Sequence, residues 1–251
     1  MAVGSQPVAK LRKAAALARR PLWRRGLMHG VAATTEHWPL RNLIAPRTVI
    51  DIGANKGQFS LFALEAWPGC RVIAFEPLPG PASRYRAVLA GNPAARLVQA
   101  AVAPEAGPVE IHLSEREDSS SLLPIAERMT GIFPQARGTG RTITVEAGPL
   151  ARFVDAKELR GGHVLLKLDV QGFELEALKG CEPCLEQLEH VYVECSYIEL
   201  YRGQALIGEV TSYLNGRGFI LAAEINLVSG KGVGRIQSDC LFSRAPINGE
   251  R

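Results

Sequence analysis

Short apolar runs rich in β-branched residues alternate with segments of helical apolar spacing along the first half of the chain. Residues 48–52 form such a run, which ends at Gly53, and residues 57–67 follow with apolar side chains at helical intervals. Residues 71–76 and 96–102 predict two more strands, and Pro81 opens a predicted helix over 82–90. Strands that alternate with helices in this way predict an α/β fold with a doubly wound, mostly parallel sheet.

The second half repeats this rhythm after a less regular stretch over residues 104–147. A buried strand is predicted at 163–169, followed by a helix that Gly180 ends. The remaining predicted elements are strands at 109–113, 142–145 and 190–195, helices at 173–179 and 207–215, and a terminal strand pair at 219–223 and 240–242. The body therefore reads as a single domain over residues 47–245, followed by a tail over 246–251.

The chain begins with a basic arm. The first 47 residues hold nine Lys or Arg residues and one acidic residue, a net charge of +8, while the whole chain carries +4 and the rest therefore −4. Residues 10–30 predict one or two short helices interrupted at Pro21, so we assign 1–46 to a helical arm. Such an arm could contact an anionic membrane, nucleic acid or the body itself, and we expect it to be peripheral to catalysis.

Composition and cysteine content favour a globular domain of enzyme size in the cytoplasm. The 251 residues include 47% apolar and 22% charged residues, which excludes a disordered or collagen-like chain. The longest apolar run of the arm, residues 14–18, is too short for a signal peptide or a membrane span. Five cysteines without a framework suit a reducing compartment, and we interpret Cys181 and Cys184 as reduced thiols near a helix.

The turn after the first predicted strand is the strongest functional motif. Asp51, Gly53, Ala54, Asn55 and Gly57 lie between a strand and a helix, where glycines let a ligand approach the backbone at the helix N-terminus. A carboxylate beside a pyrophosphate would be repelled, whereas a carboxylate beside the ammonium group of S-adenosyl-L-methionine would be attracted. The motif therefore favours a methyl-donor site over a nicotinamide dinucleotide site, whose glycines follow a different spacing.

A second acidic residue supports this interpretation. Glu76 ends the next predicted strand, 19 residues after Gly57, and Pro77 follows it. Parallel neighbouring strands bring their carboxyl ends to one edge of a sheet, so Glu76 can accept hydrogen bonds from both hydroxyls of an adenosine ribose.

At this point the chain resembles a known family. Residues 49–59, the Phe75-Glu76-Pro77 segment, residues 166–180 and the Ser238-to-Phe242 ending resemble the FkbM-type S-adenosylmethionine-dependent methyltransferases over about residues 47–244. The resemblance implies a class I, Rossmann-like methyltransferase fold with seven strands. It also implies methylation of hydroxyl groups on sugars, polysaccharides or polyketide-type products. The basic arm lies outside the shared core.

The resemblance assigns roles to individual positions. Asp51, Gly53 and Asn55 would hold the methionine part of the donor, and Glu76 its ribose. Ser120 and Ser121, in a serine loop, would lie over the adenine or the acceptor, although such serines are also common solvated turn formers. Asp169 would face the sulfonium or the amino group; the alternative is that it caps the following helix.

Methyl transfer to a sugar hydroxyl requires a group that accepts the hydroxyl proton. The candidates are Asp169, Glu174 and Glu194, and Lys167 can orient a carboxylate or stabilise a developing alkoxide. Lys167 and Asp169 share one face of a strand, but a lysine in a buried strand can equally form a structural ion pair. His163 and His190 are predicted at the surface. No cluster of acidic residues indicates a catalytic metal, so we predict none.

The sequence thus predicts a cytoplasmic S-adenosylmethionine-dependent O-methyltransferase that acts on a sugar, polysaccharide precursor or secondary metabolite. A non-catalytic or regulatory protein that binds an adenosine ligand is the main alternative, and an NAD-dependent dehydrogenase is a weaker one. The expected partners are a small-molecule or carbohydrate acceptor and no nucleic acid. A peripheral contact of the arm with anionic membrane and a homodimer are further possibilities that the sequence leaves open.

Overall fold

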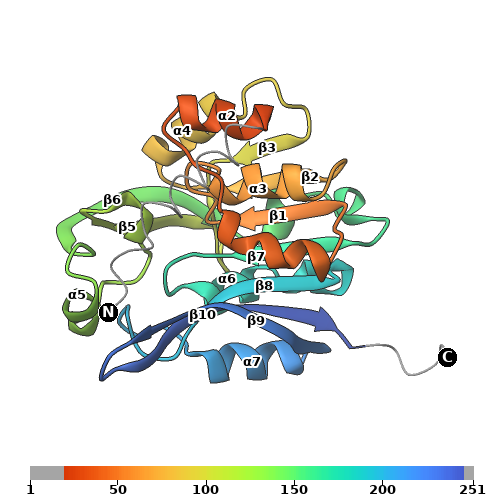
Figure 1. Ribbon diagram of the computed structural model, residues 1–251. Helices are drawn as coiled ribbons and strands as arrows, with labels where there is room; N and C mark the ends of the chain where they lie inside the picture. The colour runs from red at the N-terminus through yellow and green to blue at the C-terminus, as the bar shows by residue number, and fades with distance from the viewer. Residues whose placement is uncertain (1–19, 246–251) are drawn as a thin grey trace.

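A seven-stranded sheet organises the computed structural model, which describes residues 20–245 (Figure 1). The strand order is β3-β2-β1-β7-β8-β10-β9, with parallel pairing from β3 to β8 and antiparallel pairing of β10 with β8 and β9. The strands are β1 (Thr48–Ile52), β2 (Arg71–Phe75), β3 (Ala95–Val98), β7 (Val164–Leu168), β8 (His190–Ser196), β9 (Phe219–Gly230) and β10 (Gly234–Arg244). This arrangement confirms the predicted fold class.

Two apolar cores, one on each face of the sheet, hold the helices in place. Every residue of β1 and β7 is buried, because helices cover both faces of the central strands. On one face, residues such as Ile50 and Leu166 pack against α6 (Glu174–Gly180) and α7 (Ile207–Asn215). On the other face, Val49 and Leu165 belong to a core with residues of α2 (Pro21–Met28), α3 (Gln58–Ala66) and α4 (Pro79–Val88).

The predicted strand over residues 96–102 is wrong, because the chain changes sheets within it. Residues Ala95–Val98 form β3, and Ala101–Val102 form β4 in a separate three-stranded sheet of order β4-β6-β5. Its other strands are β5 (Gly107–Ser114) and β6 (Gly138–Gly148). In Figure 1 these strands extend to one side of the large sheet, with α5 (Glu127–Ile132) at their far end. This small sheet supplies one wall of the site described below.

The remaining helices and strands follow the prediction, with shifted ends. Helix α4 begins at Pro79, before the predicted start, because two prolines with suitable φ open its first turn. The terminal strand pair is much longer than predicted. Strands β9 and β10 continue to a tight turn at residues 231–233, although much of the outer strand β9 is exposed and therefore lacks the apolar signal of a buried strand. Short 3-10 turns complete the described elements: η1 (Thr35–Asn42), η2 (Glu117–Ser119), η3 (Leu150–Arg152), η4 (Ala156–Leu159) and η5 (Glu182–Gln187).

The segment before β1 belongs to the body of the protein. The indole ring of Trp23 is buried, its Nε1 donates to the Leu61 carbonyl of α3 at 2.8 Å, and Leu40 of η1 is also buried. The expected peripheral arm is therefore wrong for residues 20–46, because these side chains fill the core beside α3. The helix predicted before Pro21 and the tail over 246–251 lie outside the described residues. Within residues 20–245, no helix has the length and apolar character needed to cross a membrane.

We predict that Trp23→Ala lowers the free energy of unfolding by about 3–5 kcal/mol, because it empties a buried site and leaves the Leu61 carbonyl without its partner. Urea unfolding of the full chain measures this. The matched control is Met28→Ala on the same helix, since the Met28 side chain is 74% exposed and should cost little. Equal effects of the two substitutions would show that the segment is not part of the core.

Candidate functional site

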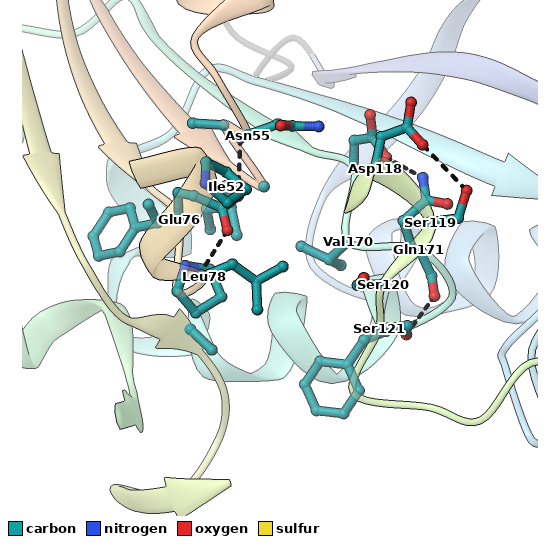
Figure 2. A pocket seen from close by; sticks show the side chains of 18 of the residues that line it. Ile52, Asn55, Glu76, Leu78, Asp118, Ser119, Ser120, Ser121, Val170 and Gln171 are labelled. Carbon is teal, nitrogen blue, oxygen red and sulfur yellow. Dashed lines mark hydrogen bonds between the residues drawn. The ribbon is translucent and has the colours of Figure 1, made fainter. Parts of the chain in front are cut away.

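A pocket of about 360 Å³ opens where β1, β2 and β7 end. Figure 2 shows its two walls. Ile52, Asn55, Glu76 and Leu78, which follow or end β1 and β2, form one wall; Asp118 to Ser121, Val170 and Gln171 form the other. The carboxyl edge of a parallel sheet is the usual place for a ligand in such folds, because the loops that leave the strands diverge there.

The loop after β1 has a backbone that requires small or left-handed residues. Gly53, Asn55 and Gly57 have φ values of +76°, +48° and +95°. A Cβ atom on Gly53 would lie 1.8 Å from the carbonyl oxygen of Asp169, so only glycine allows the loops after β1 and β7 to approach this closely. Gly57 precedes α3 and packs near Tyr85 outside the pocket lining, whereas Gly53, Ala54 and Asn55 line the pocket.

The side chain of Asn55 offers an unused acceptor. Its Oδ1 is buried and has no hydrogen-bond partner among residues 20–245, although it belongs to a residue that lines the pocket. A buried polar atom normally has a partner, so this oxygen fits the amino or hydroxyl group of a bound ligand.

Glu76 lies at the end of β2, where it was predicted, and both of its oxygens are held. Oε2 accepts from the Asn55 amide at 2.9 Å and Oε1 from the Leu78 amide at 2.8 Å. Burial raises the pKa of the Glu76 carboxyl to about 7, against the effect of these two backbone hydrogen bonds. Each oxygen retains a lone pair, so the fixed carboxylate can accept two further hydrogen bonds from a diol. Pro77, next in the chain, also lines the pocket.

Asp51 lies behind the pocket instead of in it. Its side chain is 0% exposed, its Oδ2 accepts from the Ser60 hydroxyl at 2.7 Å, and its Oδ1 lies 3.1 Å from Nζ of Lys167. The two residues face each other in the register of β1 and β7. The sequence predicts a direct contact between Asp51 and the ammonium group of the donor. In the structure Asp51 instead forms a buried ion pair with Lys167 of the neighbouring strand.

Lys167 connects this buried pair to the glycine loop. Its Nζ also donates to the Gly53 carbonyl at 3.0 Å, and Asp169 Oδ2 lies 3.9 Å away. Burial alone lowers the pKa of Lys167, but Asp51 and Asp169 outweigh burial, so its pKa is raised and the ammonium stays charged. Lys167 thus fixes the carbonyl of the loop that lines the pocket.

Asp169 faces the pocket and does not cap the following helix. Its side chain is 42% exposed, and its Oδ1 accepts from Nε2 of Gln171 at 2.7 Å. The residue at the N-cap of α6 is Phe173, which makes no side-chain capping bond. Asp169 therefore presents a negative charge to the pocket, directly after the strand that carries Lys167.

Glu174 and Glu194, the other predicted proton acceptors, are not part of the pocket lining. One oxygen of Glu174 accepts from the amides of Val170 and Gly172, both at 3.1 Å, and burial raises the pKa of this carboxyl to about 7. Glu194 accepts from Nε2 of Gln237 at 2.6 Å, and burial together with nearby carboxylates raises its pKa well above the usual range. Both carboxyls are committed to holding neighbouring residues.

The serine loop lines the pocket, as predicted, but its hydroxyl groups form hydrogen bonds with other groups of the protein. Ser121 Oγ donates to the Gln171 carbonyl at 2.6 Å, and Ser120 Oγ accepts from the Ser114 amide at 3.1 Å. These bonds tie the small sheet to the turn after β7, as Figure 2 shows for Ser121 and Gln171. The bond from Ser121 therefore joins the serine loop to Gln171 within the second wall of the pocket.

Several lining residues escaped the sequence interpretation. Thr34 and His37 come from the segment assigned to the arm, and Met129 and Phe133 come from α5 and the residue that ends it. Local sequence gives no signal for them, since all reach the pocket through long-range packing. His163 is exposed, as predicted, whereas the side chain of His190 is largely buried and bonds to Ser243, contrary to prediction.

The cysteines and acidic residues show no metal centre in residues 20–245. All five thiols are free and buried, in agreement with the interpretation of Cys181 and Cys184. No three His, Cys, Asp or Glu side chains in this part of the chain are grouped to hold a metal ion.

Comparison with known proteins identifies the family. The methyltransferase FkbM domain matches residues 51–221. The chain is 30% identical over 204 residues to the 31-O-demethyl-FK506 methyltransferase FkbM of Streptomyces tacrolimicus, which covers 70% of this chain and 74% of that protein. It is 28% identical to the 2-O-methyltransferase NoeI of Sinorhizobium fredii, over 62% of this chain and 66% of that protein. It is 27% identical to the methyltransferase sdnD of Sordaria araneosa, over 74% and 78%.

The pocket fits the methyl donor of such enzymes. It contains a carboxylate fixed by backbone amides at Glu76, a buried acceptor without a partner at Asn55 and a second carboxylate at Asp169. The family match favours the methyltransferase over the non-catalytic and dehydrogenase alternatives. The chain belongs to the FkbM family and is an S-adenosylmethionine-dependent methyltransferase.

Proposed function

We propose that this enzyme transfers the methyl group of S-adenosylmethionine to a hydroxyl group of a sugar or secondary metabolite. The names of two relatives support oxygen as the acceptor atom, since one is a 31-O-demethyl-FK506 methyltransferase and the other a 2-O-methyltransferase. The observation that carries the proposal is the mixed chemistry of the pocket lining. The apolar side chains of Met129 and Phe133 lie in the same lining as the polar groups of Arg116 and Asp118. Such a mixed lining suits an apolar skeleton with hydroxyl groups.

The donor would lie along the first wall. Glu76 would accept both ribose hydroxyls, and Asn55 Oδ1 and Asp169 would accept from the ammonium group of the methionine part. When bound, the sulfonium supplies an activated methyl group. Asp51 and Lys167 act through the loop, since together they hold the Gly53 carbonyl in place. We therefore propose positioning roles for these two residues.

The pocket lining also distinguishes between the carboxylates that the sequence offers as candidate bases. Glu174 is occupied by the amides of Val170 and Gly172, and Glu194 by Gln237, and neither lines the pocket. Asp169 lines the pocket, but its charge is the one best placed for the donor's ammonium. We therefore propose structural roles for two of the candidates. Glu174 holds the turn after β7, and Glu194 holds the side chain of Gln237.

The proposal includes two expectations from the sequence: the acceptor is a carbohydrate or a small molecule, and it is not a nucleic acid. The pocket volume of about 360 Å³ favours a compact acceptor over a polymer backbone. Membrane contact, a homodimer and a cytoplasmic location stay predictions. Four of the nine basic residues that motivate membrane contact lie in residues 1–19, outside the described part of the chain.

The burial of Glu174 predicts how the free energy of unfolding changes with pH. Its pKa is about 7 in the fold and about 4.5 when unfolded, so its contribution to stability is present below pH 4.5 and is lost as the pH rises through 7. Glu174→Gln keeps an acceptor for the two amides and removes the buried charge. We expect the variant to gain on the order of 2–3 kcal/mol of unfolding free energy relative to wild type between pH 5 and pH 8.

Urea unfolding at the two pH values measures this difference. Glu176→Gln is the matched control on the same helix, because Glu176 is exposed and pairs with Lys179 at the surface. An identical pH dependence in wild type and Glu174→Gln would show that this carboxyl carries no burial penalty, and it would return Glu174 to the candidate bases.

The proposed function is tested with donor labelled in its methyl group. The full chain is incubated with this donor and a methyl hexoside, a methyl pentoside, a polyhydroxylated macrolactone or a tRNA transcript. We expect label in a hydroxyl-bearing small molecule, as an ether that resists mild base, and none in the tRNA. Glu76→Gln should weaken donor binding by about 1.5–3 kcal/mol, while the exposed Glu105→Gln should not.

Label in the tRNA, or on nitrogen or a carboxylate of a small molecule, would contradict the proposal. Bound donor without transfer to any of these probes would limit the result to the family assignment and reject these acceptors.

A further inference from the structure

His37 reaches the pocket from outside the region that matches the family. It lies in η1, before β1, and its side chain is 13% exposed. Its ring packs edge-on against Phe59 and Tyr192, with centroids 5.2 and 5.5 Å away. The same ring lines the pocket that contains Glu76 and Asp169. His37 therefore adds a titratable side chain to the pocket lining, from a segment in which the sequence predicts no site residue.

One nitrogen of this ring is held by polar groups of the last strands. Nδ1 lies 2.8 Å from the hydroxyl of Tyr192 and 3.5 Å from Oδ2 of Asp239. Asn226 donates to the same Asp239 oxygen at 2.7 Å and lies 3.3 Å from Nδ1, which fixes the carboxylate beside the ring. Nε2 makes no hydrogen bond to any residue between 20 and 245. The ring is thus oriented through Nδ1 and leaves Nε2 available.

The charges around His37 balance in favour of a neutral ring. Burial lowers the pKa of His37 from its usual 6.5, as does Lys167 of β7 to a lesser degree. Asp239 of β10, Glu36 of η1 and Asp169 after β7 act in the opposite direction. Tyr192 of β8 completes the polar groups against the ring. At neutral pH the imidazole is therefore unprotonated in the free protein, and Asp239 is placed to stabilise it once it gains a proton.

We propose that His37 is the catalytic base of this methyltransferase and that Asp239 is its positioning residue. This proposal rests on the proposed transfer to a hydroxyl group. As the acceptor oxygen bonds to the methyl carbon, its O–H bond breaks and Nε2 takes the proton. The S–C bond breaks at the same time, and its electron pair stays on sulfur, which becomes a neutral thioether. The imidazolium then releases its proton to solvent.

The other groups of the pocket are less suited to this step. Lys167 is charged and bonded to the Gly53 carbonyl, and Asp169 accepts from Gln171 and faces the place proposed for the ammonium group. His37 and Asp239 also lie on either side of residues 51–221, so the proposed base and its partner come from the two flanks of the matched domain. The alternative is that His37 only fills the aromatic cluster around Phe59 and Tyr192.

Binding of the donor and of its demethylated product separates these two roles without any acceptor. The donor carries a sulfonium cation and the product a neutral sulfur, so an imidazolium near the sulfur opposes the donor alone. We expect the ratio of the Kd of the donor to that of the product to rise about three- to tenfold in wild type as the pH falls from 8 through the lowered pKa of His37. Carboxylates in the pocket also contribute, but they do so in every variant.

His37→Gln should remove the part of this rise that the imidazole causes, while it still binds the product at pH 8. Asp239→Asn should shift the rise to lower pH, because the imidazolium loses its carboxylate. His163→Asn is the matched control, since His163 pairs with Glu189 at the surface and its positive φ is tolerated by asparagine. It should behave as wild type. Calorimetry on variants verified as folded measures all four proteins.

Transfer of label to the best acceptor probe supplies the second readout. We expect His37→Gln to lower single-turnover transfer by about 10²- to 10⁴-fold, and Asp239→Asn to lower it less and to move its pH profile. A pH-dependent Kd ratio that is the same in His37→Gln and wild type would overturn the proposal. If wild type binds donor and product but labels no hydroxyl probe, these acceptors are rejected, while the binding ratio still decides whether His37 lies beside the sulfur.

Discussion

The ion pair between Lys167 and Asp51 is the constraint on which the site depends. Two charged groups are buried between β1 and β7, where desolvation is costly unless hydrogen bonds complete the pair. Ser60 donates a hydrogen bond to the Asp51 carboxylate, and the Gly53 carbonyl accepts one from the Lys167 ammonium. The ends of the two central strands are thereby held in one register. The loop after β1 takes its position from this register, and the close approach of Gly53 to the Asp169 carbonyl leaves no room for a side chain at this point.

Two kinds of structure meet at the pocket. The wall that holds Asn55 and Glu76 is built locally, from turns that follow β1 and β2, and its residues are close in sequence. The opposite wall and the aromatic side are built by packing: the small sheet is tied to Gln171 through Ser121, and η1 brings His37 against Tyr192. This division suits an enzyme family with one donor and varied acceptors, because the distant segments can change without altering the donor loop.

The sequence predicts the local half well and the assembled half poorly. Strand β1, the glycine turn and Glu76 follow from apolar runs and turn residues, and their positions agree with the prediction. Asp51 was expected to face the ligand, but alternation along a strand cannot reveal which buried partner stands on the next strand. His37 gave no signal, because its place depends on packing across 155 residues to Tyr192. The switch of β4 to a second sheet is likewise set by its pairing with β6.

A double-mutant cycle on Asp51→Asn and Lys167→Met, read by urea unfolding and by affinity for the demethylated donor, tests the central role of the buried pair most directly. Each single substitution should cost about 3–5 kcal/mol, because it leaves one buried charge unpaired. The double variant should regain part of that stability but still bind the product at least about tenfold more weakly than wild type, since the Gly53 carbonyl is no longer held. Additive stability effects together with unchanged product affinity in all three variants would contradict the account.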